Sequence, residues 1–282
     1  MCDSSSYYHS DQHYAHNLLQ FIIPYLSRDK KYCLFLDIDG TISEFHPDPS
    51  QSFISFTTLN TLQQLSHLNV LIIFLTGRSV KVASKLLFPL KMPIAGTHGL
   101  EIKIDDDTQF SIATNAIHFS SLQDDILKRC QPYPQLLIEN KTYSVAIHYR
   151  QHPELADIAK QITEETLETY PELKINEGKY VFELLPQQAD KGQAIQTMLE
   201  YLNLNDVFAI FIGDDKTDES GFKVINQLEG ISIKVGPEPT QAHYRLKNIE
   251  DVTDFLDLFS QFLEEHCLRL SQVSEGEKAC LD

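Results

Sequence analysis

Short apolar runs alternate with amphipathic segments along most of the chain. The runs have the length of buried strands, and they cover residues 32–37, 70–77, 93–95, 207–212 and 231–236. Apolar residues recur at helical spacing in the segments 16–27, 55–67, 79–87, 191–202 and 251–270, and in one that ends near residue 226. Strands that alternate with helices predict a parallel sheet joined by crossover helices.

A different rhythm interrupts this pattern in the middle of the chain. Residues there alternate as in antiparallel strand pairs, in the stretches 101–112, 136–150 and 173–186, with helical patterns at 120–130 and 153–169. The fold is therefore predicted to be α/β, with a Rossmann-like core formed by residues 16–104 and 188–270 and an inserted α+β domain at 105–187. Residues 1–15 and 271–282 are polar and are predicted to be flexible termini.

Composition narrows the possible functions. A chain of 282 residues with 42% hydrophobic content can bury a sizeable core, and its net charge of −17 argues against nucleic acid or an anionic membrane as a partner. Any phosphate chemistry would need a local cluster of cations or a metal ion. The polar N-terminus lacks a secretory signal, and the five cysteines are scattered, so we expect a reduced, cytoplasmic protein without disulfides or structural zinc.

The stretch LDIDGT places Asp37 and Asp39 directly at the end of the strand-like run 32–37. Ligands of open α/β sheets bind beyond the carboxyl ends of the strands, and Gly40 permits a sharp turn there. One carboxylate in this position can attack phosphorus, and a second carboxylic acid can protonate the leaving oxygen. The alternative is an ordinary Asp-Gly turn, because so short a motif often occurs by chance.

A second acidic motif, GDDKTDESGF, follows the run 207–212. Asp214, Asp215 and Asp218 are expected to hold a hard cation such as Mg²⁺, which prefers carboxylates and keeps several waters. Such a cation would offset the repulsion between Asp37 and a phosphate. The alternative is a helix start enriched in acids, which the helix dipole favours; it accounts for Asp218 better than for the adjacent pair Asp214 and Asp215.

Two further polar residues lie at predicted helix starts. Thr76, in LTGRS, can hold phosphate oxygens with its hydroxyl and the neighbouring N–H groups, although a plain helix cap is the commoner role of such a residue. Lys191, in QQADKGQAI, lies where the helix dipole disfavours a cation. A nearby anion would explain that placement, and a solvated surface lysine is the alternative.

In order and placement these motifs resemble those of the haloacid-dehalogenase (HAD) phosphatase superfamily, with DIDGT as the first, Thr76 as the second, Lys191 as the third and GDDKTD as the fourth. The inserted α+β domain resembles the cap of that superfamily. AGTHGLEI, IENKTYSVAIHYR, VFELLPQQADKGQAI and GDDKTDESGF resemble trehalose-6-phosphate phosphatases, and this similarity covers most of the chain. Ile38 departs from the family, where an aromatic residue is frequent, but it is expected to point away from the chemistry.

The resemblance implies roles for the matching positions. Asp37 would be the nucleophile and Asp39 the general acid/base, while Thr76 and Lys191 would hold the phosphate. The magnesium site would consist of Asp37, the backbone carbonyl of Asp39 and Asp214, with Asp215 or Asp218 supporting the water shell.

Substrate recognition is implied for residues of the inserted domain. Glu139, Lys141 and Glu183 match residues that hold sugar hydroxyls in that family. Glu183 lies in an apolar strand, where an unpaired charge is costly, whereas a weak surface ion pair is a serious alternative for Glu139 and Lys141. Further substrate-side positions are Arg150, His98, His148, Gly40, Arg78 and Asp218, although both histidines could equally be satisfied core residues.

The activity implied is Mg²⁺-dependent hydrolysis of trehalose 6-phosphate through a phosphoaspartate, the last step of trehalose biosynthesis. The expected partner is a small sugar phosphate made by a separate synthase, because no synthase-like domain fits within 282 residues. Other capped relatives act on sucrose phosphate, mannosyl phosphoglycerate or hexose phosphates, and these substrates stay open. A non-catalytic phosphosugar sensor is disfavoured because both aspartates are present, and a phosphoacceptor receiver domain is disfavoured because it needs no inserted domain.

Overall fold

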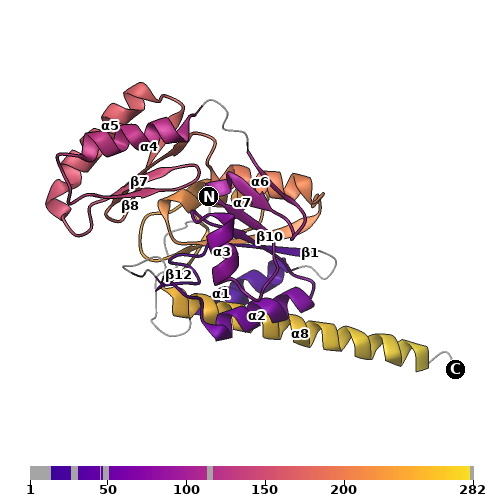
Figure 1. The fold of residues 1–282 in the computed structure, drawn as a ribbon. Helices are drawn as coiled ribbons and strands as arrows, with labels where there is room; N and C mark the ends of the chain where they lie inside the picture. Colours follow the sequence, from indigo (N-terminus) through magenta and orange to yellow (C-terminus); the bar gives the residue numbers. More distant parts are fainter. Residues whose placement is uncertain (1–13, 27–30, 45, 47–50, 113–116, 280–282) are drawn as a thin grey trace.

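A large, mostly parallel sheet forms the centre of the computed structural model, which describes residues 14–26, 31–44, 46, 51–112 and 117–279 (Figure 1). The strand order is β12-β11-β10-β1-β2-β3-β4-β5. The strands are β1 (Lys31–Leu36), β2 (Leu71–Leu75), β3 (Ile94–Gly96), β4 (Glu101–Lys103), β5 (Gln109–Ser111), β10 (Val207–Gly213), β11 (Ile231–Val235) and β12 (Tyr244–Leu246). β1 lies between β2 and β10, and all three are parallel, so their carboxyl ends meet at one edge of the sheet.

Helices cover both faces of this sheet, which is why its strands are apolar on both sides. Leu34 and Leu36 face a cluster shared with α1 (Tyr14–Ile22), α2 (Phe56–His67), α3 (Val80–Leu86) and α8 (Ile249–Ala279). Phe35, which lies between them in the sequence, faces a second cluster on the other side of the sheet. This cluster is shared with α6 (Lys191–Tyr201) and α7 (Glu219–Gln227). The continuous apolar runs thus reflect burial of alternate side chains in two separate cores.

An inserted unit lies above the carboxyl edge of the large sheet. It contains an antiparallel sheet in the order β6-β7-β9-β8, with α4 and α5 on its outer face (Figure 1). Its elements are α4 (Phe119–Cys130), β6 (Leu137–Asn140), β7 (Val145–His148), α5 (Ala156–Thr169), β8 (Leu173–Gly178) and β9 (Val181–Pro186). A third apolar cluster fills the space between its helices and its sheet.

The α/β fold class is confirmed, while two boundaries and one strand differ from the prediction. β5 pairs with β4 in the large sheet, so the predicted boundary at residue 105 falls inside that sheet. α8 runs to Ala279, whereas residues 271–282 were predicted to be flexible; residues 1–13 and 280–282 lie outside the described part of the chain. β12 was not predicted, because three residues are too short for a recognisable period.

None of the helices in the described ranges combines the length and the apolar character that crossing a bilayer requires. Within the same ranges, Cys33 and Cys130 are buried and free.

Candidate active site

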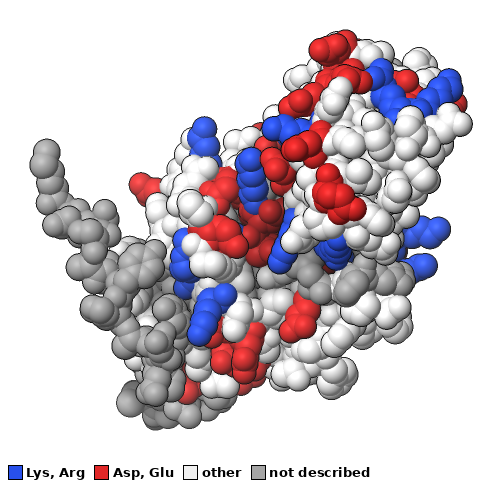
Figure 2. Space-filling view, turned by 90° about the vertical axis from the view of Figure 1, so that its left-hand side faces the viewer, with Lys and Arg blue, Asp and Glu red and all other residues white. Residues whose placement is uncertain are grey.

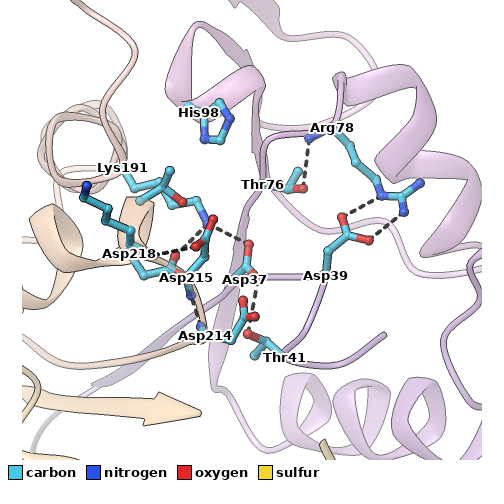
Figure 3. A network of polar contacts seen from close by, with 12 residues as sticks. Asp37, Asp39, Thr41, Thr76, Arg78, His98, Lys191, Asp214, Asp215 and Asp218 are labelled. Carbon is cyan, nitrogen blue, oxygen red and sulfur yellow. Dashed lines mark hydrogen bonds and ion pairs between the residues drawn. The ribbon is translucent and has the colours of Figure 1, made fainter. Parts of the chain in front are cut away.

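The residues singled out in the core converge at the carboxyl edge of the large sheet (Figure 3). Asp37 follows β1 directly, and its backbone N–H donates to the carbonyl of Ile212 in β10 at 3.0 Å. Thr76 follows β2, and Asp214 follows β10. Because these strands are parallel neighbours, segments far apart in the sequence bring their polar ends to one place.

A buried lysine joins two aspartates in this group. The Lys191 side chain is 3% exposed, and its ammonium group donates to Asp37 Oδ1 at 2.6 Å and to Asp218 Oδ1 at 2.6 Å. The Thr41 hydroxyl donates to the other oxygen of Asp37 at 3.2 Å. Asp218 Oδ2 accepts from the backbone N–H groups of Asp214 and Asp215 at 3.0 and 2.9 Å. Lys191 is therefore held by two carboxylates that are themselves fixed.

Negative charge is concentrated beyond what Lys191 can neutralise. Burial raises the pKa of Asp37 to about 7 although Lys191 opposes that shift. Burial, with the charges of Asp37 and Asp218, raises the pKa of Asp214 to about 9. Burial by itself would lower the pKa of Lys191, but the attraction of the two aspartates outweighs it and raises that pKa. The cluster would thus be stabilised by a further positive charge.

The donor set fits a hard divalent cation. Carboxylate oxygens of Asp37, Asp214 and Asp218 lie within 4.8 Å of one another. Asp214 Oδ1 is buried and has no hydrogen-bond partner among the described residues, so one oxygen is left over for a ligand. Both oxygens of Asp218 and both oxygens of Asp37 already accept hydrogen bonds, so Asp214 is the carboxylate of this group with an oxygen left for a cation.

Two predicted metal ligands have other contacts. Asp215 Oδ1 accepts from the Lys216 N–H at 2.7 Å, so this carboxylate caps the short helix η5 (Lys216–Asp218). In the described part of the chain, the carboxylates close enough to share a cation are those of Asp37, Asp214 and Asp218, and Asp215 is not among them. The carboxylate of Asp39 pairs with Arg78, so its side chain has a partner other than a cation.

Asp214, in the second acidic motif, lies so close to residue 40 that only glycine fits there. It has φ +87°, in the left-handed region, and a Cβ atom added there would lie 2.0 Å from Asp214 Oδ2. A side chain at this position would therefore both strain the turn and displace the Asp214 carboxylate.

Arg78 holds the second aspartate of LDIDGT. Its Nε and one terminal nitrogen donate to the two oxygens of Asp39 at 2.7 and 2.6 Å, and the same terminal nitrogen donates to Ser52 Oγ at 2.8 Å. Burial lowers the pKa of Arg78, but the Asp39 hydrogen bonds and the charges of Asp39 and Glu139 outweigh it. The Arg78 guanidinium group thus pairs with an acid of the core and is within electrostatic range of an acid of the inserted unit.

The turn after β2 positions Thr76 at the same carboxyl edge of the large sheet as Asp37. Thr76 is 1% exposed, and its hydroxyl oxygen accepts from the Arg78 N–H at 3.1 Å, which leaves its proton to be donated elsewhere. Thr97 and His98 have φ +47° and +53°, a costly conformation for residues with side chains. The N–H of His98 donates to the carbonyl of Thr76 at 2.9 Å, so this strained turn supports the one that carries Thr76.

Glu183 is the centre of the polar network in the inserted unit. It is 6% exposed, and its Oε1 accepts from Lys141 Nζ at 2.8 Å and from Ser144 Oγ at 2.6 Å. Its Oε2 lies 3.5 Å from His98 Nε2 in the core. Burial would raise the pKa of Glu183, but His98 and Lys141 lower it well below its usual range. The carboxylate therefore stays ionised and connects the inserted unit to the core.

The structure brings some of the remaining predicted residues to this region and leaves one outside it. Glu139 Oε2 pairs with His148 Nε2 at 2.9 Å, and Glu139 acts electrostatically on Arg78 and Lys141. Arg150 is exposed and follows the end of β7, so it is not part of this network of contacts.

Several contributing residues were not singled out from the sequence. Ser52 and Ser144 are ordinary polar positions, and only the folded chain brings them to Arg78 and Glu183. Lys234 is 2% exposed within β11, and its ammonium group donates to the carbonyl of Asp214. A lysine inside the apolar run ISIKVG is costly to bury without a hydrogen-bond partner. Its position in the sequence therefore could have predicted that it contacts a polar group of the site.

An α/β core with this set of groups at its strand ends has the HAD hydrolase fold. A haloacid dehalogenase-like hydrolase from Bacteroides thetaiotaomicron superposes with a TM-score of 0.59 and 16% identity, over 84% of this chain and 99% of that chain. The model of the trehalose-phosphatase family matches residues 35–250. The chain belongs to the trehalose-phosphatase family, and it is accordingly a phosphoric monoester hydrolase.

Relatives in both sequence and structure agree. The trehalose-6-phosphate phosphatase of Escherichia coli (strain K12) is 32% identical over 241 residues, which is 83% of this chain and 89% of the relative. The probable trehalose-phosphate phosphatase H of Arabidopsis thaliana is 31% identical over 257 residues, 83% of this chain and 73% of the relative. The C-terminal domain of the C. albicans trehalose-6-phosphate phosphatase has a TM-score of 0.74 at 23% identity, with 83% of this chain and 93% of that chain covered.

Proposed function

We propose that this enzyme hydrolyses trehalose 6-phosphate to trehalose and phosphate in the cytoplasm, with Mg²⁺ as its metal ion and Asp37 as its nucleophile. The observation that carries the proposal is the network of Glu183, Lys141 and His98, which connects the inserted unit to the phosphatase core. The names of its relatives support the choice of sugar.

In the proposed reaction, a carboxylate oxygen of Asp37 attacks phosphorus and forms an acyl phosphate, while Asp39 gives a proton to the departing sugar oxygen. Asp39 then takes a proton from the water that hydrolyses the acyl phosphate. Lys191 and the Thr76 hydroxyl offset the charge on the phosphate oxygens. Asp39 faces Arg78 in this structure, so the pair must separate first, and the nearby Glu139 offers Arg78 another partner.

The metal ion would be held by Asp37, Asp214 and the carbonyl of Asp39, with Asp218 and Lys234 fixing the segment that carries Asp214. When bound, Mg²⁺ would neutralise the carboxylate cluster and polarise the phosphate. The cluster itself supports this reading, because its acids are crowded in the absence of a cation.

A substrate panel tests the proposal directly. Phosphate release would be measured from trehalose 6-phosphate, sucrose 6-phosphate, glucose 6-phosphate and p-nitrophenyl phosphate, with Mg²⁺ and with EDTA. We expect a strong preference for trehalose 6-phosphate that is lost in EDTA. A preference for another sugar phosphate would reject trehalose 6-phosphate as the substrate but leave the proposed mechanism intact. No turnover by folded protein would favour a phosphosugar sensor.

Glu183→Gln is expected to impair sugar recognition more than phosphate chemistry. The change removes the charge that holds Lys141 and His98, so kcat/KM for trehalose 6-phosphate should fall roughly 10- to 100-fold, the value of a charged hydrogen bond. The same parameter for p-nitrophenyl phosphate should change by less than about threefold. Glu172→Gln, on an exposed residue, is the matched control; equal losses on both substrates would contradict a role in sugar recognition.

Asp214→Asn is expected to stabilise the metal-free protein and to abolish its response to Mg²⁺. The substitution removes a crowded acid, so the free energy of unfolding in EDTA at pH 8 should rise by about 1–3 kcal/mol. Added Mg²⁺ should raise the Tm of the wild type and leave the variant unchanged. Differential scanning fluorimetry measures both effects, and Asp254→Asn on α8 serves as the control. An equal Mg²⁺ response in wild type and variant would remove Asp214 from the metal site.

A further inference from the structure

A cavity of about 390 Å³ lies between the inserted unit and the core. Its walls come from α5 and the edge strand β8 on one side and from the starts of α6 and α7 on the other. Its volume is within the range of small-molecule sites. Glu139, Lys141 and Glu183 are not among its lining residues, whereas His98 and Lys191 are, so the cavity adjoins the proposed active site and lies beside its sugar-side acids.

Lysines predominate among the charged residues that line this cavity. Lys160 and Lys174 come from the inserted unit and Lys216 from the core, with Lys191 in the wall that the cavity shares with the catalytic group. Acidic lining residues are Glu177 and Asp190, and Asp190 already accepts from the N–H of Gln193 as the cap of α6. Figure 2 shows how acidic and basic side chains mingle in the hollowed middle of one face.

Two of these lysines lack an internal partner. Lys174 and Lys216 make no side-chain hydrogen bond or ion pair with any other residue in the described ranges, and Lys160 has only an exposed contact with Glu164 at 3.9 Å. Lys174 is half-buried and Lys216 is exposed at the mouth of the cavity. Although the chain has 40 acidic and 23 basic residues, neither lysine has an acid partner in the described ranges. Their repulsion would be relieved by a bound anion.

Two other polar groups in the same walls point to a ligand as well. His98 lines the cavity and is 7% exposed, and its Nδ1 is buried without a partner among the described residues. Thr217, which also belongs to the core, adds a hydroxyl group to the lining. An unsatisfied buried ring nitrogen is costly unless a bound molecule or water completes it.

We propose that this cavity is a second oxyanion site, which takes a tetrahedral anion of the phosphate class between Lys174 of the inserted unit and Lys216 of the core. The anion is either inorganic phosphate or the phosphate group of a sugar phosphate. Because its two lysines belong to different units, bound anion restrains their relative movement and slows turnover without competing for the Asp37 site. The site is independent of which sugar the enzyme accepts.

The test compares the Mg²⁺-loaded wild type with Lys174→Gln/Lys216→Gln in hydrolysis of p-nitrophenyl phosphate, with sulfate as the probe and chloride at equal ionic strength as the reference. In the wild type, sulfate should lower kcat as well as raise KM. In the double variant the effect on kcat should weaken by at least about fivefold, while the competitive effect on KM and the activity without sulfate stay within about twofold. Lys179→Gln/Lys223→Gln changes the same charge on exposed residues of both units and should behave as the wild type.

A binding measurement separates failure of this site from failure of the proposed function. Sulfate should raise the Tm of the wild type more than that of Lys174→Gln/Lys216→Gln, even if trehalose 6-phosphate is not a substrate. Glucose 6-sulfate that acts more strongly than sulfate on kcat identifies a sugar phosphate as the natural anion, and equal or weaker action identifies inorganic phosphate. Purely competitive inhibition of the wild type, or equal loss in both double variants, would overturn the second site.

Discussion

Asp37→Asn should lose at least about 10³-fold in kcat while the protein stays folded, because no other carboxylate in the described site takes the position directly after β1. An amide cannot form the acyl phosphate, and it keeps the size of the side chain. The fold should tolerate the change, since burial raises the pKa of Asp37 to about 7 and the folded state therefore gains little from its ionised form.

Single-turnover phosphate release and Tm would be measured together on the same preparation. Asp37→Glu is an informative companion, because it keeps the charge but displaces the nucleophile. Asp105→Asn, on the exposed turn between β4 and β5, controls for loss of one acid elsewhere. Near-normal turnover by the Asp37→Asn protein would reject the nucleophile assignment and, with it, the proposed mechanism.

Lys191→Met is expected to cost both stability and activity. The substitution leaves Asp37 and Asp218 buried without their shared cation, and breaking a buried pair in this way typically costs about 3–5 kcal/mol. Each kcal/mol corresponds to roughly 2–4 °C in Tm for a chain of this size. Turnover should fall as well, because the same ammonium group is proposed to offset charge on the phosphate.

A second substitution separates the two effects of Lys191. In Lys191→Met/Asp218→Asn, one of the stranded charges is gone, so part of the lost stability should return and the two changes should not be additive. Activity should stay low in the double variant. Lys223→Met, on an exposed lysine of α7, provides the control. An unchanged Tm for Lys191→Met in EDTA would show that the ion pairs contribute nothing to stability.

The fold and the core motifs were largely predictable because their signals are local. Strands such as β1 and β10 are apolar on both faces, and their carboxyl ends carry the acids that chemistry needs. The same logic located Thr76 and Lys191 at the start of the elements that follow. By contrast β5 was assigned to the inserted domain, because an antiparallel pattern does not reveal which sheet a strand joins.

Within the site, the sequence predicted which residues are near the chemistry better than what each one contacts. Asp215 and Asp218 are equivalent in GDDKTD, yet one caps a short helix and the other holds Lys191. Arg150 belonged to a recognisable motif but lies outside the network. Alternation along a strand determines which residues share a face, whereas side-chain contacts depend on how separate segments meet.

The sequence by itself determined the α/β class, the family and the aspartates, threonine and lysine at the strand ends, because period and motif are properties of short segments. Only the tertiary structure decided that Arg78 holds Asp39, that Glu183 meets His98 across the two units, and that Lys174 and Lys216 face one cavity. These pairs are separated by 39, 85 and 42 positions in the chain, respectively. The first pair is set by the alignment of β1 and β2 within the core, and the other two by the packing of the inserted unit against the core; no local pattern records either.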